Sequence, residues 1–214
     1  EPMLKTGDKR YRFELDTLVE LKGMLESGRP AREMDLPCER RQLVESLFLL
    51  TMKPTMIIAN LPEECADCLD KAAAEIPLRA GVPVIAVCAE LERQLGELEP
   101  EDARAYLASL GLERSALDSV VTAGYRLLDL ITFFTIKGVE TRAWTVHRGT
   151  SAPKAAGKIH TDMERGFIRA EVIQWDLLLQ EGSFGAAREH GRVRTEGKDY
   201  VVQDGDVILF RFNV

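Results

Sequence analysis

Two short polar segments, each after an apolar run, contain the residues of this 214-residue chain best suited to bind a ligand. The first is Asn60-Leu61-Pro62-Glu63, which follows Thr55–Ala59, and the second is Cys88-Ala89-Glu90, which follows Val82–Val87. Open α/β sheets bind ligands at the carboxyl ends of their parallel strands. An amide, a carboxylate and backbone N–H groups at such an edge would recognise a polar ligand by hydrogen bonding.

The chain around these segments predicts the unit that must position them. Both apolar runs are unbroken, which is typical of parallel strands covered on both faces, so we expect buried strands. Between them, the Glu- and Ala-rich stretch Cys65–Leu78 predicts a helix. Strand, helix and strand at this spacing indicate a βαβ unit.

Two helices are predicted before this unit. In the first, leucines recur at three- and four-residue intervals from Leu15 to Leu25, and Gly28 and Pro30 end it. The second is expected from about residue 39 to 50. Together they indicate a helical hairpin or arm over residues 1–50.

Further helices are predicted after the second strand. One begins at Pro100 and ends at Gly111, and another runs from the capping pair Ser115 and Asp118 to about Leu130. We assign residues 51–130 to one domain.

Residues 131–214 predict a second, α+β domain, so the fold class is α/β plus α+β. The expected elements are a hairpin, a helix, a strand, a short helix and a terminal hairpin turning at Asp204-Gly205. Their approximate residue ranges are 131–136 with 141–147, 154–163, 167–173, 186–190, and 199–202 with 207–212.

Charge is distributed unevenly over a chain whose net charge is −7. Leu61–Val120 holds 13 acidic and 5 basic residues, whereas Lys137–Arg169 holds 7 basic and 3 acidic. The net charge argues against general coating of nucleic acid, but the basic stretch indicates a local contact with RNA or another polyanion. A solvated surface of mixed sign explains the same counts. No apolar run approaches the length of a membrane span.

Metal, redox and acid–base chemistry are not predicted. Of the four cysteines, Cys65 and Cys68 form a C-x-x-C, but no second ligand pair accompanies it. The three histidines are too dispersed for a metal cluster, and His160 beside Asp162 is expected to act as a local cap. No residue is therefore assigned as catalytic.

The run Ala155–Ala170 resembles the signature sequence of a TGS domain, a ubiquitin-like β-grasp module. Its particular residues resemble the TGS domain of YchF-type (Obg-like) P-loop ATPases. Further segments across nearly the whole chain look like the same family. They are Leu50–Pro54, Ala123-Gly124-Tyr125, Arg142–Thr145 and Gly197–Val207, followed by the terminal Phe212-Asn213-Val214. The resemblance implies a helical arm, part of a P-loop nucleotide-binding sheet and a TGS domain over residues 131–214.

The two polar loops resemble the base-recognition loops of P-loop GTPases, which read Asn-Lys-x-Asp and Ser-Ala-x. Here Glu63 stands where guanine-specific enzymes place Asp, and a longer side chain moves the carboxylate away from the guanine N1–H and amine. The resemblance therefore implies ATP in preference to GTP. The nucleotide-binding residues would be Asn60, Leu61, Glu63, Cys88 and Ala89. The alternative interpretation of Asn-Leu-Pro-Glu is a plain turn and helix start.

The sequence contains no G-x-x-x-x-G-K-[ST], so the phosphate-binding loop and the Mg²⁺ ligands expected of the family are not in this chain. We expect the chain alone not to hydrolyse nucleotide. The resemblance implies a cytoplasmic, ribosome-associated ATPase that also uses GTP, with no membrane partner and no evident DNA specificity. The proposed rRNA contacts are Lys154, Lys158, Arg165 and Arg169. A non-catalytic, TGS-bearing ribosome-binding adaptor is the alternative.

Overall fold

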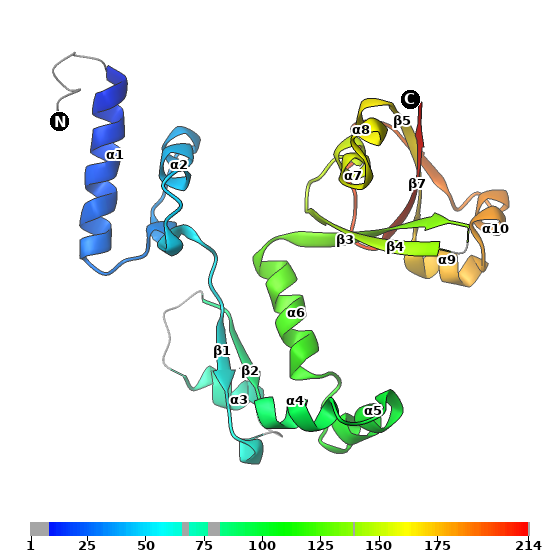
Figure 1. Ribbon diagram of the computed structural model, residues 1–214, viewed down its shortest axis with the longest axis horizontal. Helices are drawn as coiled ribbons and strands as arrows, with labels where there is room; N and C mark the ends of the chain where they lie inside the picture. Colours follow the sequence, from blue (N-terminus) through cyan, green and yellow to red (C-terminus); the bar gives the residue numbers. More distant parts are fainter. Residues whose placement is uncertain (1–8, 66–68, 77–81, 139, 214) are drawn as a thin grey trace. The chain divides into compact units, whose positions relative to one another are not determined.

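The computed structural model describes residues 9–65, 69–76, 82–138 and 140–213 (Figure 1). The chain divides into two compact units, Glu1–Met56 and Ile57–Val214. Each unit has its own apolar clusters and is described separately.

The first unit is helical. A small core joins its helices through Leu21, Met34 and Val44, together with the fully buried Ala31. Gly28 follows the first helix with φ +76°, a conformation that ends a helix readily because glycine has no Cβ. The elements are α1 (Lys9–Glu26), the short 3₁₀ helices η2 (Ala31–Glu33) and η3 (Leu50–Met52), and α2 (Cys38–Glu45).

The second predicted helix of this unit is shorter than expected. We predicted it to continue to residue 50, whereas α2 ends at Glu45. The Ser46 hydroxyl donates a hydrogen bond to the Leu43 carbonyl at 2.6 Å. Phe48 adopts φ +51°, which is incompatible with a continuing helix. Phe48 is consequently 85% exposed.

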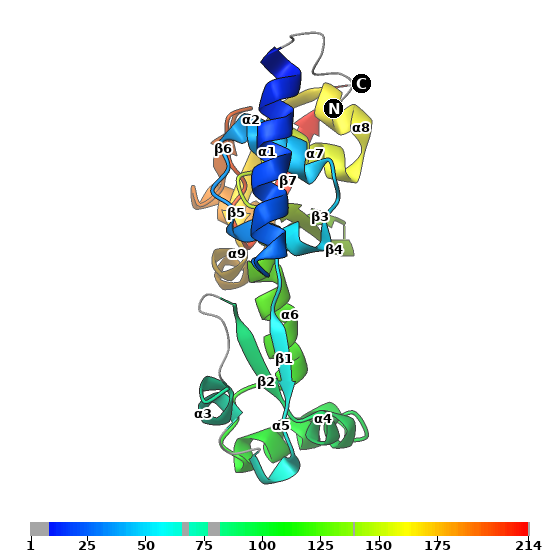
Figure 2. The ribbon, with the colours of Figure 1, turned by 90° about the vertical axis from the view of Figure 1, so that its left-hand side faces the viewer.

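The second unit begins with two strands, β1 (Ile57–Asn60) and β2 (Val84–Val87), which lie side by side in Figures 1 and 2. They pair in parallel with Ile57 opposite Val84, which confirms the predicted orientation. The expectation of full burial was wrong for this chain: no residue of either strand is buried, and Ile58 is 50% exposed. The described part of the chain provides only these two strands for the sheet.

Only part of the helix predicted between the strands lies within the described residues. A 3₁₀ turn, η4 (Glu63–Cys65), and α3 (Leu69–Ala74) are present, whereas residues 66–68 and 77–81 are not described. The C-x-x-C segment therefore lies partly outside the described residues.

Three helices follow β2: α4 (Ala89–Leu95), α5 (Pro100–Ser109) and α6 (Ala116–Leu127). Helix α4 was not predicted. The predicted cap of α6 is confirmed, because the Ser115 hydroxyl accepts a hydrogen bond from Asp118 N at 3.1 Å. Leu91, Leu95 and Leu107 pack together with Cys88 in a small core, yet α6 contains no buried residue.

Residues 130–212 form a five-stranded sheet in the order β4-β3-β7-β5-β6. The predicted β3–β4 hairpin is confirmed, with Leu130 opposite His147. The last strand lies in the middle, parallel to β3 and antiparallel to β5. The strands are β3 (Leu130–Lys137), β4 (Glu140–His147), β5 (Phe167–Gln174), β6 (Arg194–Glu196) and β7 (Asp206–Phe212).

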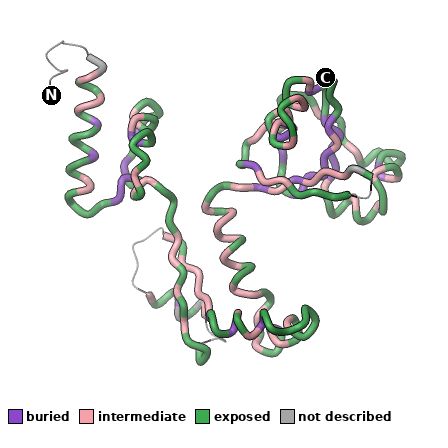
Figure 3. Tube along the Cα trace, in the orientation of Figure 1, coloured by how far each residue is buried: buried purple, intermediate pink, exposed green. Residues whose placement is uncertain are grey.

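Helices cover both faces of this sheet (Figure 1). On one face, α7 (Ala152–Ile159) and α8 (Thr161–Arg165) close a core that includes Phe133 and Phe210, whose rings meet edge to face at 6.0 Å. On the other, α9 (Trp175–Glu181) and α10 (Phe184–Glu189) form a smaller core with Ile173 and Val207. Figure 3 shows most of the buried residues of the second unit in this region.

One predicted helix is in fact two, because His160 is extended between α7 and α8. Its Nδ1 accepts a hydrogen bond from Asp162 N at 3.2 Å, as expected of a local cap.

The predicted terminal hairpin was wrong. Residues 199–202 form only an isolated bridge between Val201 and Ser151, and β7 pairs with β3 and β5 instead. The buried Asp206 carboxylate explains the difference, because it accepts hydrogen bonds from Tyr200 OH at 2.7 Å and Gln203 N at 2.8 Å. These bonds close a loop where the sequence suggests a second strand.

Candidate functional site

The two predicted ligand-binding loops meet at the carboxyl ends of β1 and β2. Asn60 and Val87 are opposite each other, and Leu61 N continues the ladder by donating to the Val87 carbonyl at 2.8 Å. The Asn60 side chain then crosses to the second loop, where its Oδ1 accepts a hydrogen bond from Ala89 N at 3.1 Å. One amide side chain therefore fixes the spacing of both loops.

Cys88 has a structural role in this arrangement. It is only 1% exposed and stands at the N-cap of α4, where its Sγ accepts a hydrogen bond from Leu91 N at 3.5 Å. The thiol is covered, so a ligand at this edge would meet the loop backbone instead of the sulfur.

The two carboxylates near this edge differ in availability. Glu63 begins η4 and is exposed. Glu90 is held by Arg93, whose Nη2 lies 2.8 Å from Glu90 Oε1, and hydrogen bonds from Arg93 and Gln94 lower the pKa of Glu90. Glu63 is therefore the carboxylate better placed to meet a ligand.

The Asn60 amide has a defined orientation. Oδ1 accepts the hydrogen bond from Ala89 N, so this bond uses neither of the two N–H donors on the amide nitrogen. The N7 atom of both adenine and guanine is an acceptor. An oriented Asn60 could therefore bind either purine, and discrimination would fall to Glu63.

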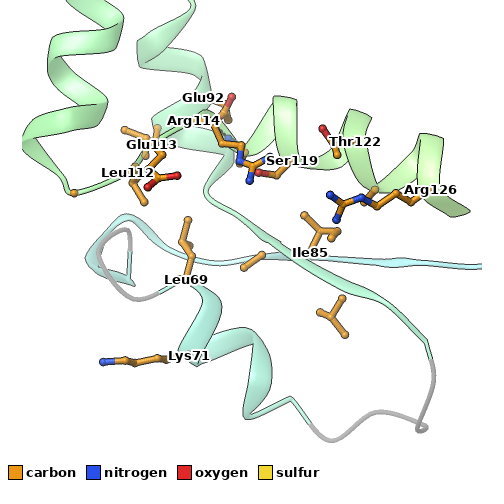
Figure 4. A pocket seen from close by; sticks show the side chains of 16 residues that line it. Leu69, Lys71, Ile85, Glu92, Leu112, Glu113, Arg114, Ser119, Thr122 and Arg126 are labelled. Carbon is orange, nitrogen blue, oxygen red and sulfur yellow. Dashed lines mark hydrogen bonds between the residues drawn. The ribbon is translucent and has the colours of Figure 1, made fainter. Parts of the chain in front are cut away.

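A hollow of about 690 Å³ lies beside β2 (Figure 4), and none of the five predicted nucleotide-binding residues lines it. Val84, Ile85 and Ala86 line it, together with residues of α3, α4 and α6 and of the loop between α5 and α6. Glu92 on its rim caps α6 by accepting a hydrogen bond from Ala116 N at 2.7 Å. The hollow and the loop edge are distinct features of this region.

The four basic residues predicted to contact RNA do not share one face. Lys154 and Lys158 are exposed on α7, and Arg165 is exposed on α8. Arg169 belongs to β5, where its neighbour Ala170 points into the core beneath α7. Side chains alternate along a strand, so Arg169 lies on the opposite face of the sheet.

On that opposite face, Arg169 joins a group of charges that the sequence did not reveal. Glu171, with its side chain 8% exposed, contacts Arg169, Arg188 and Arg211. Arg188 comes from α10 and Arg211 from β7. The alternation of Arg169 and Glu171 was the available signal for a shared face, but their partners come from elements distant in sequence.

Within the described ranges, no three His, Cys, Asp or Glu side chains gather as a metal site requires. No helix among the same residues combines the length and apolar character needed to cross a bilayer.

The parallel strands and the loops joined at their carboxyl ends place this part of the chain in the α/β class. Residues 130–213 match the family model YchF-GTPase_C, described as a protein of unknown function (DUF933). This match covers the carboxy-terminal part of the chain, and the YchF relatives below are similar to nearly all of it.

The relatives match nearly the whole chain. A Bacillus subtilis (strain 168) protein named ribosome-binding ATPase YchF is 46% identical over 99% of the chain, which covers 59% of that protein. A Haemophilus influenzae protein of the same name is 46% identical over 98% of the chain, which covers 58% of it.

A solved structure shows the same similarity. The Schizosaccharomyces pombe YchF GTPase superposes with a TM-score of 0.83 at 30% identity, over 95% of this chain and 55% of that one. The chain thus spans less than two thirds of the length of these relatives.

Proposed function

We propose that this chain is the carboxy-terminal part of a ribosome-binding ATPase, and that its two joined loops hold the base of the nucleotide. The observation that carries the proposal is the hydrogen bond from Ala89 N to Asn60 Oδ1, which joins the loops at the ligand-binding edge of the strands. The names of the bacterial relatives support the activity. Leu61 and Cys88 would contribute backbone groups.

Glu63 would set the preference for ATP over GTP. A carboxylate only accepts hydrogen bonds, and guanine offers two neighbouring donors where adenine offers an acceptor and no amine. The exposed Glu63 side chain is one methylene longer than the Asp of guanine-specific loops, so it would not meet that pair of donors. GTP would then be used, but less well.

The folding units would correspond to a helical arm at 1–50, part of a P-loop nucleotide-binding domain at 51–130 and a TGS domain of the β-grasp class at 131–214. The strand order β4-β3-β7-β5-β6, with the last strand in the middle and α7 packed on one face, supports the β-grasp assignment. The family match over residues 130–213 supports the last boundary.

Phosphate and Mg²⁺ binding would reside in a part of the protein that this sequence does not include, because no G-x-x-x-x-G-K-[ST] occurs in it. This chain alone would then bind nucleotide weakly and not hydrolyse it. The ribosome would be its partner in the cytoplasm, with Lys154, Lys158, Arg165 and Arg169 as candidate rRNA contacts.

The first test is to read the coding sequence upstream of Glu1 and to express the longer protein. We expect a G-x-x-x-x-G-K-[ST] upstream and ATP hydrolysis at a higher kcat/KM than GTP hydrolysis. A gene without that motif would instead support the non-catalytic, TGS-bearing adaptor.

The second test addresses the loops in that longer protein. Asn60→Ala should weaken ATP and GTP alike, because its amide would serve both purines. Glu63→Asp should raise the ratio of GTP to ATP hydrolysis by about tenfold, a difference of about 1.4 kcal/mol. An unchanged ratio would remove Glu63 from base recognition.

A further inference from the structure

The three arginines around Glu171 form a cluster built from three separate elements. Arg211 Nε donates to Glu171 Oε1 at 3.1 Å, Arg188 Nη2 donates to Oε2, and Arg169 Nη2 lies 3.7 Å from Oε1. We call Arg169, Arg188, Arg211 and Glu171 the arginine cluster. It occupies the sheet face opposite α7.

The strand register brings like charges together. Arg169 and Arg211 are direct cross-strand partners on β5 and β7. Like charges in directly opposite positions destabilise a sheet. Glu171 follows on the same face, but its single negative charge meets three positive charges. Among the residues the structure describes, no other carboxylate forms an ion pair with any of the three. The cluster therefore retains two positive charges in excess.

The arginines are accessible although their shared partner is covered. Their side chains are 54%, 53% and 46% exposed for Arg169, Arg188 and Arg211, against 8% for Glu171. Burial alone would raise the pKa of Glu171, but the hydrogen bonds from Arg211 and Arg188 outweigh it and lower that pKa. An ionised, fixed carboxylate thus orients guanidinium groups whose outer edges face solvent.

The remaining donors match a phosphate group. Each guanidinium has five N–H donors in a planar fork, and a carboxylate accepts about four hydrogen bonds in all. Most N–H donors of the three guanidinium groups are therefore left for a second, external acceptor. A guanidinium group can bind a phosphate through two parallel hydrogen bonds. A guanidinium group that is already held in place loses less conformational entropy on binding than a mobile side chain.

We propose that the arginine cluster binds backbone phosphates of RNA, with Arg169, Arg188 and Arg211 as the contacts and Glu171 as the positioning residue. The choice of RNA among phosphate-bearing partners rests on the proposed ribosome-binding function. Arg169 then acts with Arg188 and Arg211 on this face, separately from the basic residues of α7 and α8.

The test uses the 214-residue chain and a labelled single-stranded RNA of about 20 nucleotides, with binding followed between about 50 and 200 mM KCl. Arg188→Gln is the primary variant because Arg188 belongs to α10, its side chain is 53% exposed, and the substitution changes no strand residue. A plot of log K against log salt concentration has a negative slope, and we expect the variant's slope to be shallower. Its magnitude should decrease by about 0.7 for each phosphate that the variant no longer neutralises. The double variant Arg169→Gln/Arg188→Gln should show twice that decrease in the magnitude of the slope. Its binding at low salt should be weaker by at least tenfold.

The matched control is Arg142→Gln on β4, whose exposed side chain also pairs with a carboxylate, Glu140. It should leave the slope unchanged, and Arg188→Lys should recover part of the affinity. If the Arg188 and Arg169 variants keep the wild-type slope, the proposal is wrong. It is also wrong if they lose binding to polyglutamate while keeping RNA, which would make the cluster a site for acidic protein.

Sedimentation with Bacillus subtilis ribosomes separates this proposal from the proposed function. If the wild-type chain sediments with ribosomes and the variants do so equally well, the function stands and the cluster has no part in it. If the chain does not sediment but its RNA binding depends on the arginines, the phosphate site stands and ribosome binding fails. If it binds neither, both are overturned.

Discussion

The two sheets of the second unit differ in how far they satisfy their own packing. The five-stranded sheet buries residues on both faces under helices, with Phe133 fully buried in one of its cores. The two-stranded sheet has no buried residue in either strand, and the nearby α6 buries none of its side chains. A pair of strands alone is marginally stable in water. The five-stranded sheet is thus packed on both faces, whereas the two-stranded sheet has no buried face among the described residues.

The largest expected effect comes from the core of the five-stranded sheet beneath α7. Phe133→Ala should lower the free energy of unfolding by about 3–5 kcal/mol, because it leaves a cavity beneath α7. The half-exposed Ile58 of β1 gives the contrast, and Ile58→Ala should cost about 1 kcal/mol. Urea denaturation measures both, and equal losses would contradict the difference between the sheets.

The next effect concerns two glycines. An added Cβ at Gly166 would lie 1.8 Å from the Asn213 carbonyl oxygen, so Gly166→Ala must displace the end of β7 and should cost about 1–3 kcal/mol. Gly124 in α6 has nothing within 4 Å of such a Cβ. Gly124→Ala should therefore stabilise α6 by about 1 kcal/mol through helix propensity. Thermal unfolding of both variants checks the pair, and a destabilising Gly124→Ala would show that α6 is packed more tightly than its exposure indicates.

A pH dependence should distinguish the five-stranded sheet as well. Burial and the hydrogen bond to Asp206 raise the pKa of Tyr200 to about 12. The unfolded chain would ionise this tyrosine near pH 10. The stability that the protonated form contributes is therefore complete below pH 10 and lost as the pH rises towards about 12. The difference in unfolding free energy between wild type and Tyr200→Phe should shrink over that range, and a constant difference would contradict the shift.

The smallest expected effect concerns how readily a thiol reagent labels Cys88, near the two-stranded sheet. Cys88 is buried in the region of the two-stranded sheet, so it becomes reactive only when that region opens. In a variant with Cys38, Cys65 and Cys68 changed to serine, a thiol reagent should label Cys88 at urea concentrations below those that unfold the five-stranded sheet. Labelling that coincides with global unfolding would mean that the two regions open together.

Sequence patterns predicted the parts of this fold that depend on local signals. The parallel pairing of β1 and β2, the Ser115 cap and the β3–β4 hairpin each follow from periodicity or capping residues over a few positions. The terminal hairpin failed because a buried carboxylate, Asp206, organises the preceding loop. An Asp-Gly pair does not reveal that its aspartate neighbour will be buried.

The candidate site was predictable to a similar degree. Strand ends placed Asn60 and Ala89 at one edge, but the hydrogen bond between them depends on side-chain orientation. The arginine cluster escaped prediction because Arg169, Arg188 and Arg211 come from three elements, which only the pairing of β5 with β7 and the packing of α10 bring together.

The position of β7 between β3 and β5 constrains the biosynthesis of the protein. The strand that joins the β3–β4 pair to the β5–β6 pair is translated after all four. While residues 206–212 are still inside a translating ribosome, the two pairs have no shared hydrogen bonds and their apolar faces lack a central strand. This sheet can therefore assemble only after its last strand has emerged, and a pause in translation before Asp206 would prolong the period in which chaperones can bind it.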